Sequence, residues 1–230
     1  MLRVVLLFSA FITSVSFAND KPSTVQQDFV DDLVNNHQFD AAYVTSVLAK
    51  ANKSDAILEA IARPWEAKPW YQYYPIFLTD KRLQKGLEFW STHQDGLERA
   101  EKTFGVPAEI IVAIIGVETF YGSYTGKYGV LDSLYTLGFY YPPRSKFFKS
   151  ELKELFLLSR EEGFNPTELM GSYAGAMGWG QFISSSYRHY AVDFDEDGTR
   201  DLLNNPVDAI GSVANYFKQH GWQANQPVAF

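Results

Sequence analysis

The sequence predicts a mainly α-helical protein. Few segments alternate apolar and polar residues with the period of two that half-buried strands require, whereas apolar residues recur at helical spacing along much of the chain. The clearest helix is the last one, in which Asn205 is placed to cap, Pro206 to begin and Gly221 to end the element. With 230 residues, 46% of them hydrophobic, the chain is long enough to form one globular domain with a sizeable core.

The first 18 residues differ in pattern from the rest of the chain. A short basic start, Met1–Arg3, precedes an apolar stretch, Val4–Phe17, and a small-x-small cleavage pattern ends at Ala18. This order predicts a secretory signal peptide over 1–18. The alternative is an uncleaved membrane anchor, for which the apolar stretch is short. We therefore expect a periplasmic protein without a membrane anchor.

The segment up to residue 104 is predicted to be helical with one irregular stretch. From about residue 23 to residue 62 we expect short amphipathic helices, with Ser54 as the N-cap of the third. Residues 63–78 are rich in proline, tryptophan and tyrosine, which favours an extended strap across the surface. A long helix over about 79–104 should follow, capped by Thr79 or Asp80. The residues expected to face inward along it are Leu83, Leu87, Trp90 and Leu97.

The later segments contain both helices and glycine-rich loops. An almost wholly apolar helix over Pro107–Thr119 belongs in the core, because it has no polar face. We then expect a glycine- and tyrosine-rich turn region over 121–141 and an amphipathic helix over 144–162. A glycine-dense segment, 171–180, and an acidic loop, 193–208, precede the final helix.

Glu118 is the first candidate for a catalytic residue. It lies at the end of the apolar helix and directly before an aromatic turn that ends at Gly122. Burial would raise the pKa of its carboxyl, and the negative end of the helix dipole would act in the same direction. A carboxyl that stays protonated near neutral pH is what a glycosidase needs as a general acid. The alternative is a glutamate that reaches solvent past the last buried turn and has no catalytic role.

The segment Gly175–Phe182 is too glycine-rich for a helix and too apolar for a linker. Glycines of this kind let the backbone approach a ligand closely or pack tightly on a neighbouring element. Within the segment, Gln181 offers an amide that could hydrogen-bond a sugar. The alternative is a tight structural turn that only introduces the next helix.

The acidic loop resembles the first part of an EF-hand, with oxygen ligands at alternate positions and Gly198 at the sixth position. The ligands expected within it are the carboxylates of Asp193, Asp195 and Asp197 and the backbone carbonyl of Thr199. The bidentate glutamate of the twelfth position is replaced by Asn204, and Asp208 is the best substitute in a longer loop. We expect a structural Ca²⁺ site. The alternative is a solvated acidic turn.

Composition excludes several other classes of function. A net charge of −7 argues against nucleic acid as a partner, because that binding depends on basic patches. The absence of cysteine excludes disulfides and thiolate metal sites.

Asp132 could be a second catalytic carboxylate, although it is better placed to cap the segment that begins at Ser133.

Six motifs in order carry a resemblance to a known family. They are Gly116–Gly122, Leu131–Leu134, Tyr141–Arg144, Gly171–Phe182, Ala191–Gly198 and Pro206–Phe217. Together they resemble the membrane-bound lytic transglycosylase B family from roughly Trp65 to Trp222. The resemblance implies a lysozyme-like α-rich domain over 19–230, with an N-terminal helical part and strap (19–104), a catalytic core (105–222) and a tail (223–230).

The resemblance also implies an activity and a set of site residues. Members cut peptidoglycan between N-acetylmuramic acid and N-acetylglucosamine and leave a 1,6-anhydro ring, without a catalytic cofactor. The single catalytic glutamate falls on Glu118, which would act first as acid and then as base. The groove residues fall on Tyr73, Arg144, Ser172, Gln181 and Tyr216, and the calcium ligands on Asp193, Asp195, Asp197, Thr199 and Asp208. The expected partner is the glycan strand of peptidoglycan, and we expect a monomer.

Two departures from the family pattern affect these expectations. Pro143 stands where the family often has the first of two arginines. The sequence also ends soon after the final helix, so it is short at its C-terminus relative to the family. In the family, the later stretch supplies an asparagine and a tyrosine beside the glutamate. We therefore expect a weakened fold and reduced activity.

Three alternatives to a lytic transglycosylase remain open at this stage. A muramidase that uses water would need a second carboxylate, such as Asp132, near Glu118. A non-catalytic peptidoglycan-binding module would keep the groove and lose turnover. A calcium-stabilised structural protein would leave Glu118 and the aromatic strap unexplained.

Overall fold

The computed structural model describes residues 24–64, 67–224 and 226, so the predicted signal peptide lies outside the described residues. Helices dominate, which confirms the mainly α prediction. The longer helices are α1 (Thr24–His37), α2 (Ala41–Leu48), α3 (Asp55–Ala62), α5 (Asp80–Thr92), α6 (Gln94–Phe104), α7 (Ala108–Thr119), α8 (Val130–Tyr140), α9 (Ser145–Glu162) and α11 (Pro206–Gln219). The shorter elements are α4 (Trp70–Tyr73), η2 (Tyr74–Ile76), η3 (Pro142–Arg144), α10 (Ser184–Tyr190) and the strands β1 (Tyr128–Gly129) and β2 (Met170–Gly171). None of the helices in the described ranges combines the length and the apolarity needed to cross a bilayer.

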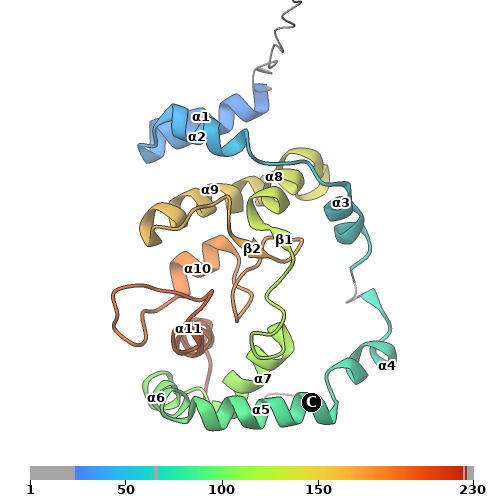
Figure 1. Cartoon of the computed structure of the whole chain (residues 1–230), viewed down its shortest axis with the longest axis vertical. Helices are drawn as coiled ribbons and strands as arrows, with labels where there is room; N and C mark the ends of the chain where they lie inside the picture. Colours follow the sequence, from blue (N-terminus) through green and yellow to red (C-terminus); the bar gives the residue numbers. More distant parts are fainter. Residues whose placement is uncertain (1–23, 65–66, 225, 227–230) are drawn as a thin grey trace, which may run out of the picture.

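The helices pack around one buried apolar cluster. Figure 1 shows α1 and α2 at one end, α8 and α9 beside them, and α5, α6 and α7 at the other end. Between these groups α10 packs on α9, and α11 packs on α6 and α7. Phe156 from α9 and Leu97 from α6 are both fully buried, so the cluster extends through the molecule.

Two predicted helix starts are confirmed by their caps. The Ser54 hydroxyl accepts a hydrogen bond from the Ile57 amide at the start of α3. The Asn205 side chain accepts from the Val207 amide at the start of α11, with Pro206 at the first helical position. Each cap satisfies an amide that the first turn of a helix leaves without a partner.

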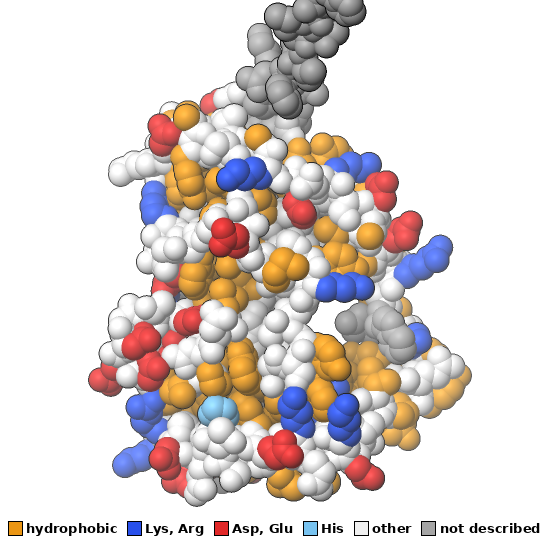
Figure 2. Space-filling model, in the orientation of Figure 1, with side chains coloured by type: hydrophobic (Ala, Val, Ile, Leu, Met, Phe, Trp, Pro, Cys, Tyr) orange, Lys and Arg blue, Asp and Glu red, His pale blue; other side chains and the backbone are white. Residues whose placement is uncertain are grey.

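The strap over 63–78 is not extended as predicted, because its described part forms α4 and η2. Pro69 is the N-cap of α4, and Pro75 lies in the first turn of η2. Proline is tolerated at these positions, since no intrahelical hydrogen bond is lost there. The aromatic residues between the prolines remain on the surface, with Trp70 71% exposed and Tyr71 69% exposed. This segment connects α3 to α5 at a distance from the main body, and the face beside it is hollowed (Figures 1 and 2).

The predicted long helix over 79–104 is two helices. Thr79 caps α5 through a bond from the Arg82 amide, as expected. His93 then leaves the helical conformation, with φ −115° and ψ 24°, and α6 begins at the next residue. Because the chain turns at His93, α6 packs against α11, whereas α5 packs against α7.

The inward face of α5 was also predicted wrongly in part. Leu83 and Leu87 are exposed, whereas Gly86 and Phe89 are buried. The Tyr121 side chain explains this orientation, because a Cβ atom added to Gly86 would lie 2.5 Å from the Tyr121 hydroxyl oxygen. Helix α5 therefore turns its glycine toward α7 and leaves the two leucines in solvent.

The region over 121–141, predicted as turns, contains the helix α8. Most of its residues are buried, so no polar face marks it in the sequence. Asp132 lies inside α8 and does not cap it, since Gly129 is the N-cap. The Asp132 carboxylate instead accepts a hydrogen bond of 2.8 Å from the Asn52 amide, which ties the α2–α3 connection to α8. Before α8, β1 pairs antiparallel with β2, so that Tyr128 faces Gly171.

A group of ion pairs fastens α10 and the acidic loop to α9. Arg188 donates to both carboxylate oxygens of Glu161 and also pairs with Glu154, and Arg200 pairs with Glu162. Hydrogen bonds from Arg188 hold the pKa of the Glu161 carboxyl below its ordinary value of 4.5.

The free energy of unfolding of the Glu161→Gln variant should therefore lack the pH-dependent contribution that Glu161 makes in the wild-type chain. A depressed folded-state pKa adds stability above the unfolded pKa, and that stability disappears as the pH falls through the folded value. After screening by solvent we expect a loss of about 1 kcal/mol at pH 7 and a smaller loss near pH 3. Urea unfolding at several pH values measures this difference. Glu59→Gln, an exposed glutamate without an ion pair among the described residues, is the control. A pH-independent difference between wild type and Glu161→Gln would contradict the assignment.

Candidate active site

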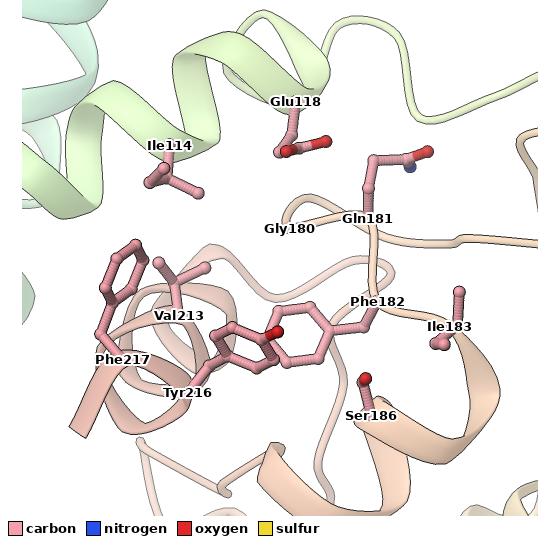
Figure 3. A pocket seen from close by; sticks show the side chains of 10 residues that line it. All are labelled: Ile114, Glu118, Gly180, Gln181, Phe182, Ile183, Ser186, Val213, Tyr216 and Phe217. Atoms are coloured by element: carbon pink, nitrogen blue, oxygen red, sulfur yellow. The ribbon is translucent and has the colours of Figure 1, made fainter. Parts of the chain in front are cut away.

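A pocket of about 330 Å³ lies between the end of α7, the glycine-rich segment and α11. Its lining residues are Ile114, Glu118, Gly180, Gln181, Phe182, Ile183, Ser186, Val213, Tyr216 and Phe217. In Figure 3, Glu118 and Gln181 lie on one side of this pocket, and Val213, Tyr216 and Phe217 lie on the other. Three of the residues singled out in the sequence, Glu118, Gln181 and Tyr216, are thus brought together.

Glu118 projects from the last turn of α7 and is exposed. The prediction of a buried carboxyl is therefore wrong, because α7 turns its Glu118 face toward the pocket and buries the face that carries Ile111 and Ile115. The pocket nevertheless places apolar surface around the carboxylate, including Ile114 one turn earlier on the same helix. A ligand that filled the pocket would remove water from Glu118.

The backbone after Glu118 is held in a sharp turn. Phe120 and Tyr121 both adopt the left-handed conformation, with φ of 52° and 57°. The buried Thr119 hydroxyl donates to the Trp179 carbonyl at 2.9 Å and accepts from the Gly122 amide at 3.0 Å. These bonds offset the strain of two successive left-handed residues and join the end of α7 to the glycine-rich segment. Thr119 was not predicted as a site residue, although it lies within the Gly116–Gly122 motif.

Gln181 is fixed by its own hydrogen bonds. Its Nε2 donates to the carbonyls of Thr125 and Gly178, each at 3.0 Å. Its backbone has a φ of 50°, which is unusual for a residue with a side chain. Because both amide hydrogens are used, the Oε1 atom is the part of this side chain that can accept a bond from a ligand hydroxyl or amide.

Tyr216 forms the far wall of the pocket within an aromatic group. Its ring stacks on His220 with 4.0 Å between centroids and meets the edges of Phe182 and Tyr190 at 5.7 and 5.1 Å. Rigid aromatic faces of this kind suit the apolar faces of sugar rings. The remaining wall residues, such as Val213, were not predicted, since apolar helical residues look like core in a sequence.

Tyr73, Arg144 and Ser172 are not part of this pocket lining. Tyr73 lies in α4 with its ring 5.1 Å from that of Phe77. The Arg144 guanidinium lies over the Phe147 ring at 4.4 Å, at the exposed end of η3. The Ser172 hydroxyl accepts hydrogen bonds from the Ala174 and Ala176 amides, so it stabilises the glycine-rich turn.

The acidic loop brings three of its predicted ligands together. One carboxylate oxygen each from Asp193, Asp195 and Asp197 lies within 4.8 Å of the others. The loop closes through bonds from the Asp197 and Gly198 amides to Asp193, and Gly198 has a φ of 97° that glycine adopts without strain. A set of oxygen donors at this spacing fits a hard cation such as Ca²⁺.

Asp208 lies outside this group of three carboxylates. It is fully buried at the start of α11, and its two oxygens accept hydrogen bonds from the Phe194 and Asp201 amides at 2.7 and 2.8 Å. Asp208 therefore connects Phe194 and Asp201 of the acidic loop to the first turn of α11. The Thr199 amide donates to Asp197 within the loop.

Comparison with known proteins adds independent evidence. The chain is 46% identical over 223 residues to membrane-bound lytic murein transglycosylase B of Escherichia coli, covering 93% of this chain and 61% of the relative. The E. coli lytic transglycosylase Slt35, solved in complex with calcium, matches with a TM-score of 0.85 and 46% identity, covering 93% of this chain and 67% of that chain. SltB3 of Pseudomonas aeruginosa, solved in complex with NAG-NAM-pentapeptide, matches with a TM-score of 0.79 and 33% identity, covering 88% of this chain and 54% of that chain.

The chain thus spans about 61% of the length of the E. coli relative. Residues 22–230 match the family described as the transglycosylase SLT domain, and this match includes every residue of the pocket and of the acidic loop. The matched structures also have the lysozyme-like fold that the sequence motifs predicted. On this evidence the chain belongs to the transglycosylase SLT domain family.

Proposed function

We propose that this chain is a lytic transglycosylase that cleaves peptidoglycan between N-acetylmuramic acid and N-acetylglucosamine and forms 1,6-anhydro ends. The observation that carries the proposal is the position of Glu118. It is the one carboxylate among the described residues that line the pocket, with Gln181 beside it and a wall that contains Val213, Tyr216 and Phe217 opposite.

One carboxyl group is enough for this reaction. Glu118 first donates its proton to the oxygen of the glycosidic bond as that bond breaks. The resulting carboxylate then accepts the proton of the muramoyl C6 hydroxyl, whose oxygen bonds to the anomeric carbon and closes the anhydro ring. The proton count of the enzyme is restored, and no water is consumed. Sugar rings that fill the pocket would exclude water from Glu118, which favours its protonated form before bond cleavage.

The other predicted site residues are assigned to binding. Gln181 and Tyr216 contact the sugars beside Glu118. Tyr73, Arg144 and Ser172, which lie outside this pocket, would contact more distant units of the strand. We assign catalysis to residues 105–222 and keep 19–104 as an N-terminal helical part with its aromatic strap, and we place the protein in the periplasm, where its substrate is found.

The test is the identity of the products. The purified chain is incubated with peptidoglycan, and the released muropeptides are analysed by mass spectrometry. Anhydromuramoyl ends are the expected result. Reducing muramic acid ends would instead show the hydrolytic muramidase, for which the pocket offers no second carboxylate among its described lining residues. Binding to peptidoglycan without any product would show the non-catalytic binding module.

We further propose that the acidic loop binds one structural Ca²⁺ through Asp193, Asp195 and Asp197 and the carbonyl of Thr199, with Asp208 holding the loop in shape. The calcium complex of Slt35 supports this assignment. Ca²⁺ would offset the repulsion among three carboxylates that lie close together.

Calcium should therefore raise the Tm of the chain. At a free concentration of 100 times Kd, binding to the folded state alone adds about 2.7 kcal/mol, or roughly 5 to 10 °C for a chain of this size. Thermal unfolding with and without Ca²⁺ measures the shift. Asp195→Asn should remove most of it, whereas Glu196→Gln, the same charge change one residue away, should keep it. An undiminished shift in Asp195→Asn would rule out this ligand set.

A further inference from the structure

Two lysines and a pair of aromatic rings gather beside the end of α7. The Nζ atoms of Lys81 and Lys85, both from α5, lie 5.8 and 5.2 Å from the centre of the Phe120 ring. The Tyr124 ring stacks on Phe120 with 6.0 Å between centroids and is 71% exposed. Lys85 also donates a hydrogen bond to the Ser123 hydroxyl. We call these five residues the lysine–aromatic patch.

The positive charge of this patch is not neutralised within the described part of the chain. Neither lysine forms an ion pair there, although Asp80 and Glu88 lie nearby on the same helix and are exposed. Figure 2 shows basic side chains gathered over α5, at the border of the hollowed face. In a chain with a net charge of −7, two lysines without an ion pair at this place would attract an anionic ligand.

The patch is connected directly to the candidate active site. Phe120 follows Glu118 by two residues, and Ser123 precedes Thr125 by two. The Thr125 carbonyl accepts the hydrogen bond that fixes Gln181 in the pocket. Since two residues of chain span at most about 7 Å, a ligand group on the patch lies close to a sugar seated beside Gln181.

We infer that the lysine–aromatic patch binds the carboxylates of the peptide stems that the glycan carries, an inference that rests on the proposed function. A stem attached to muramic acid advances about 3.3 Å per residue, so a few residues reach from the pocket to Lys85. The ammonium groups pair with the stem carboxylates, and the exposed face of Tyr124 packs against the stem's aliphatic atoms. The patch would make the enzyme prefer glycan with peptide stems over bare glycan.

The test compares binding by the full chain in the Glu118→Gln background, which prevents turnover. The ligands are NAG-NAM-pentapeptide, the same compound with its carboxylates amidated, and neutral chitotetraose. Calorimetry at low salt gives Kd for the parent chain and for the double variant Lys81→Gln/Lys85→Gln. The control variant, Lys102→Gln/Lys146→Gln, makes the same charge change on exposed lysines of α6 and α9.

Loss of the two lysines should weaken binding of the carboxylate ligand about fivefold and leave the amidated ligand and chitotetraose unchanged. The control variant should bind all three ligands like the parent chain. Equal weakening of charged and amidated ligands, or equal weakening in the control variant, would overturn the inference alone. Failure of the parent chain to bind any of the three would overturn both the inference and the proposed function.

Discussion

The Glu118→Gln chain is expected to release anhydromuramoyl products at least about a thousandfold more slowly than the wild-type chain. General acid–base groups contribute about 10²- to 10⁴-fold each, and Glu118 serves in both halves of the proposed reaction. Glutamine keeps the size and hydrogen-bonding ability of the side chain but neither gives nor takes a proton under these conditions. Product release from peptidoglycan, followed by mass spectrometry over time, measures the effect.

Glu109→Gln is the matched control, because it makes the same change at an exposed position in the first turn of the same helix. It should retain wild-type activity. The Glu118→Gln chain should still bind peptidoglycan in a pelleting assay, since the pocket walls are unchanged. If Glu118→Gln retained more than a tenth of wild-type activity, the single-carboxyl mechanism would be wrong.

The second large effect is expected for Gly126→Ala, which should destabilise the chain by about 4 kcal/mol or more. Gly126 has a φ of 117°, a conformation that residues with a side chain rarely adopt. A Cβ atom at this position would lie 2.0 Å from the backbone of Gly171, so the crossing of these two segments would have to open. Urea unfolding gives the change in free energy.

Gly105→Ala separates the cost of the positive φ from the cost of the steric contact with Gly171. Gly105 also has a positive φ, 74°, but a Cβ atom there meets nothing within 4 Å, so only the conformational cost of about 1 kcal/mol remains. Gly126→Ala should also lower activity in the residual folded protein, because the adjacent Thr125 carbonyl holds Gln181. Equal destabilisation by the two substitutions would show that the contact with Gly171 is unimportant.

The parts of the fold that sequence reasoning predicted well are those with local signals. Ser54 and Asn205 were recognisable as caps, because a short polar side chain before an apolar run has a local partner in the first turn of the helix. The three aspartates of the acidic loop were recognisable from their alternate spacing and from Gly198. Each of these signals depends on residues close together in the chain.

The parts that were missed depend on contacts between distant segments. Helix α8 is buried along most of its length by packing on α9, so it lacks the polar face that would have marked it as a helix. Leu83 and Leu87 are exposed because the Tyr121 ring packs against Gly86 of α5. No local sequence pattern predicts this contact. For the same reason Glu118 was wrongly expected to be buried, since its exposure to the pocket depends on the positions of α11 and the glycine-rich segment.

The Tyr121 ring has a consequence for how this sequence can change over evolutionary time. Its hydroxyl end lies between α5 and α7, where a Cβ atom on Gly86 would be 2.5 Å away and one on Gly116 would be 2.6 Å away. The Tyr121 ring therefore occupies the space that a side chain at Gly86 or at Gly116 would need. A larger residue at either glycine becomes acceptable only after the tyrosine has become smaller, so the order of substitutions is constrained. Among descendants of this chain, these three positions should be inherited as a unit, while the exposed residues around them vary independently.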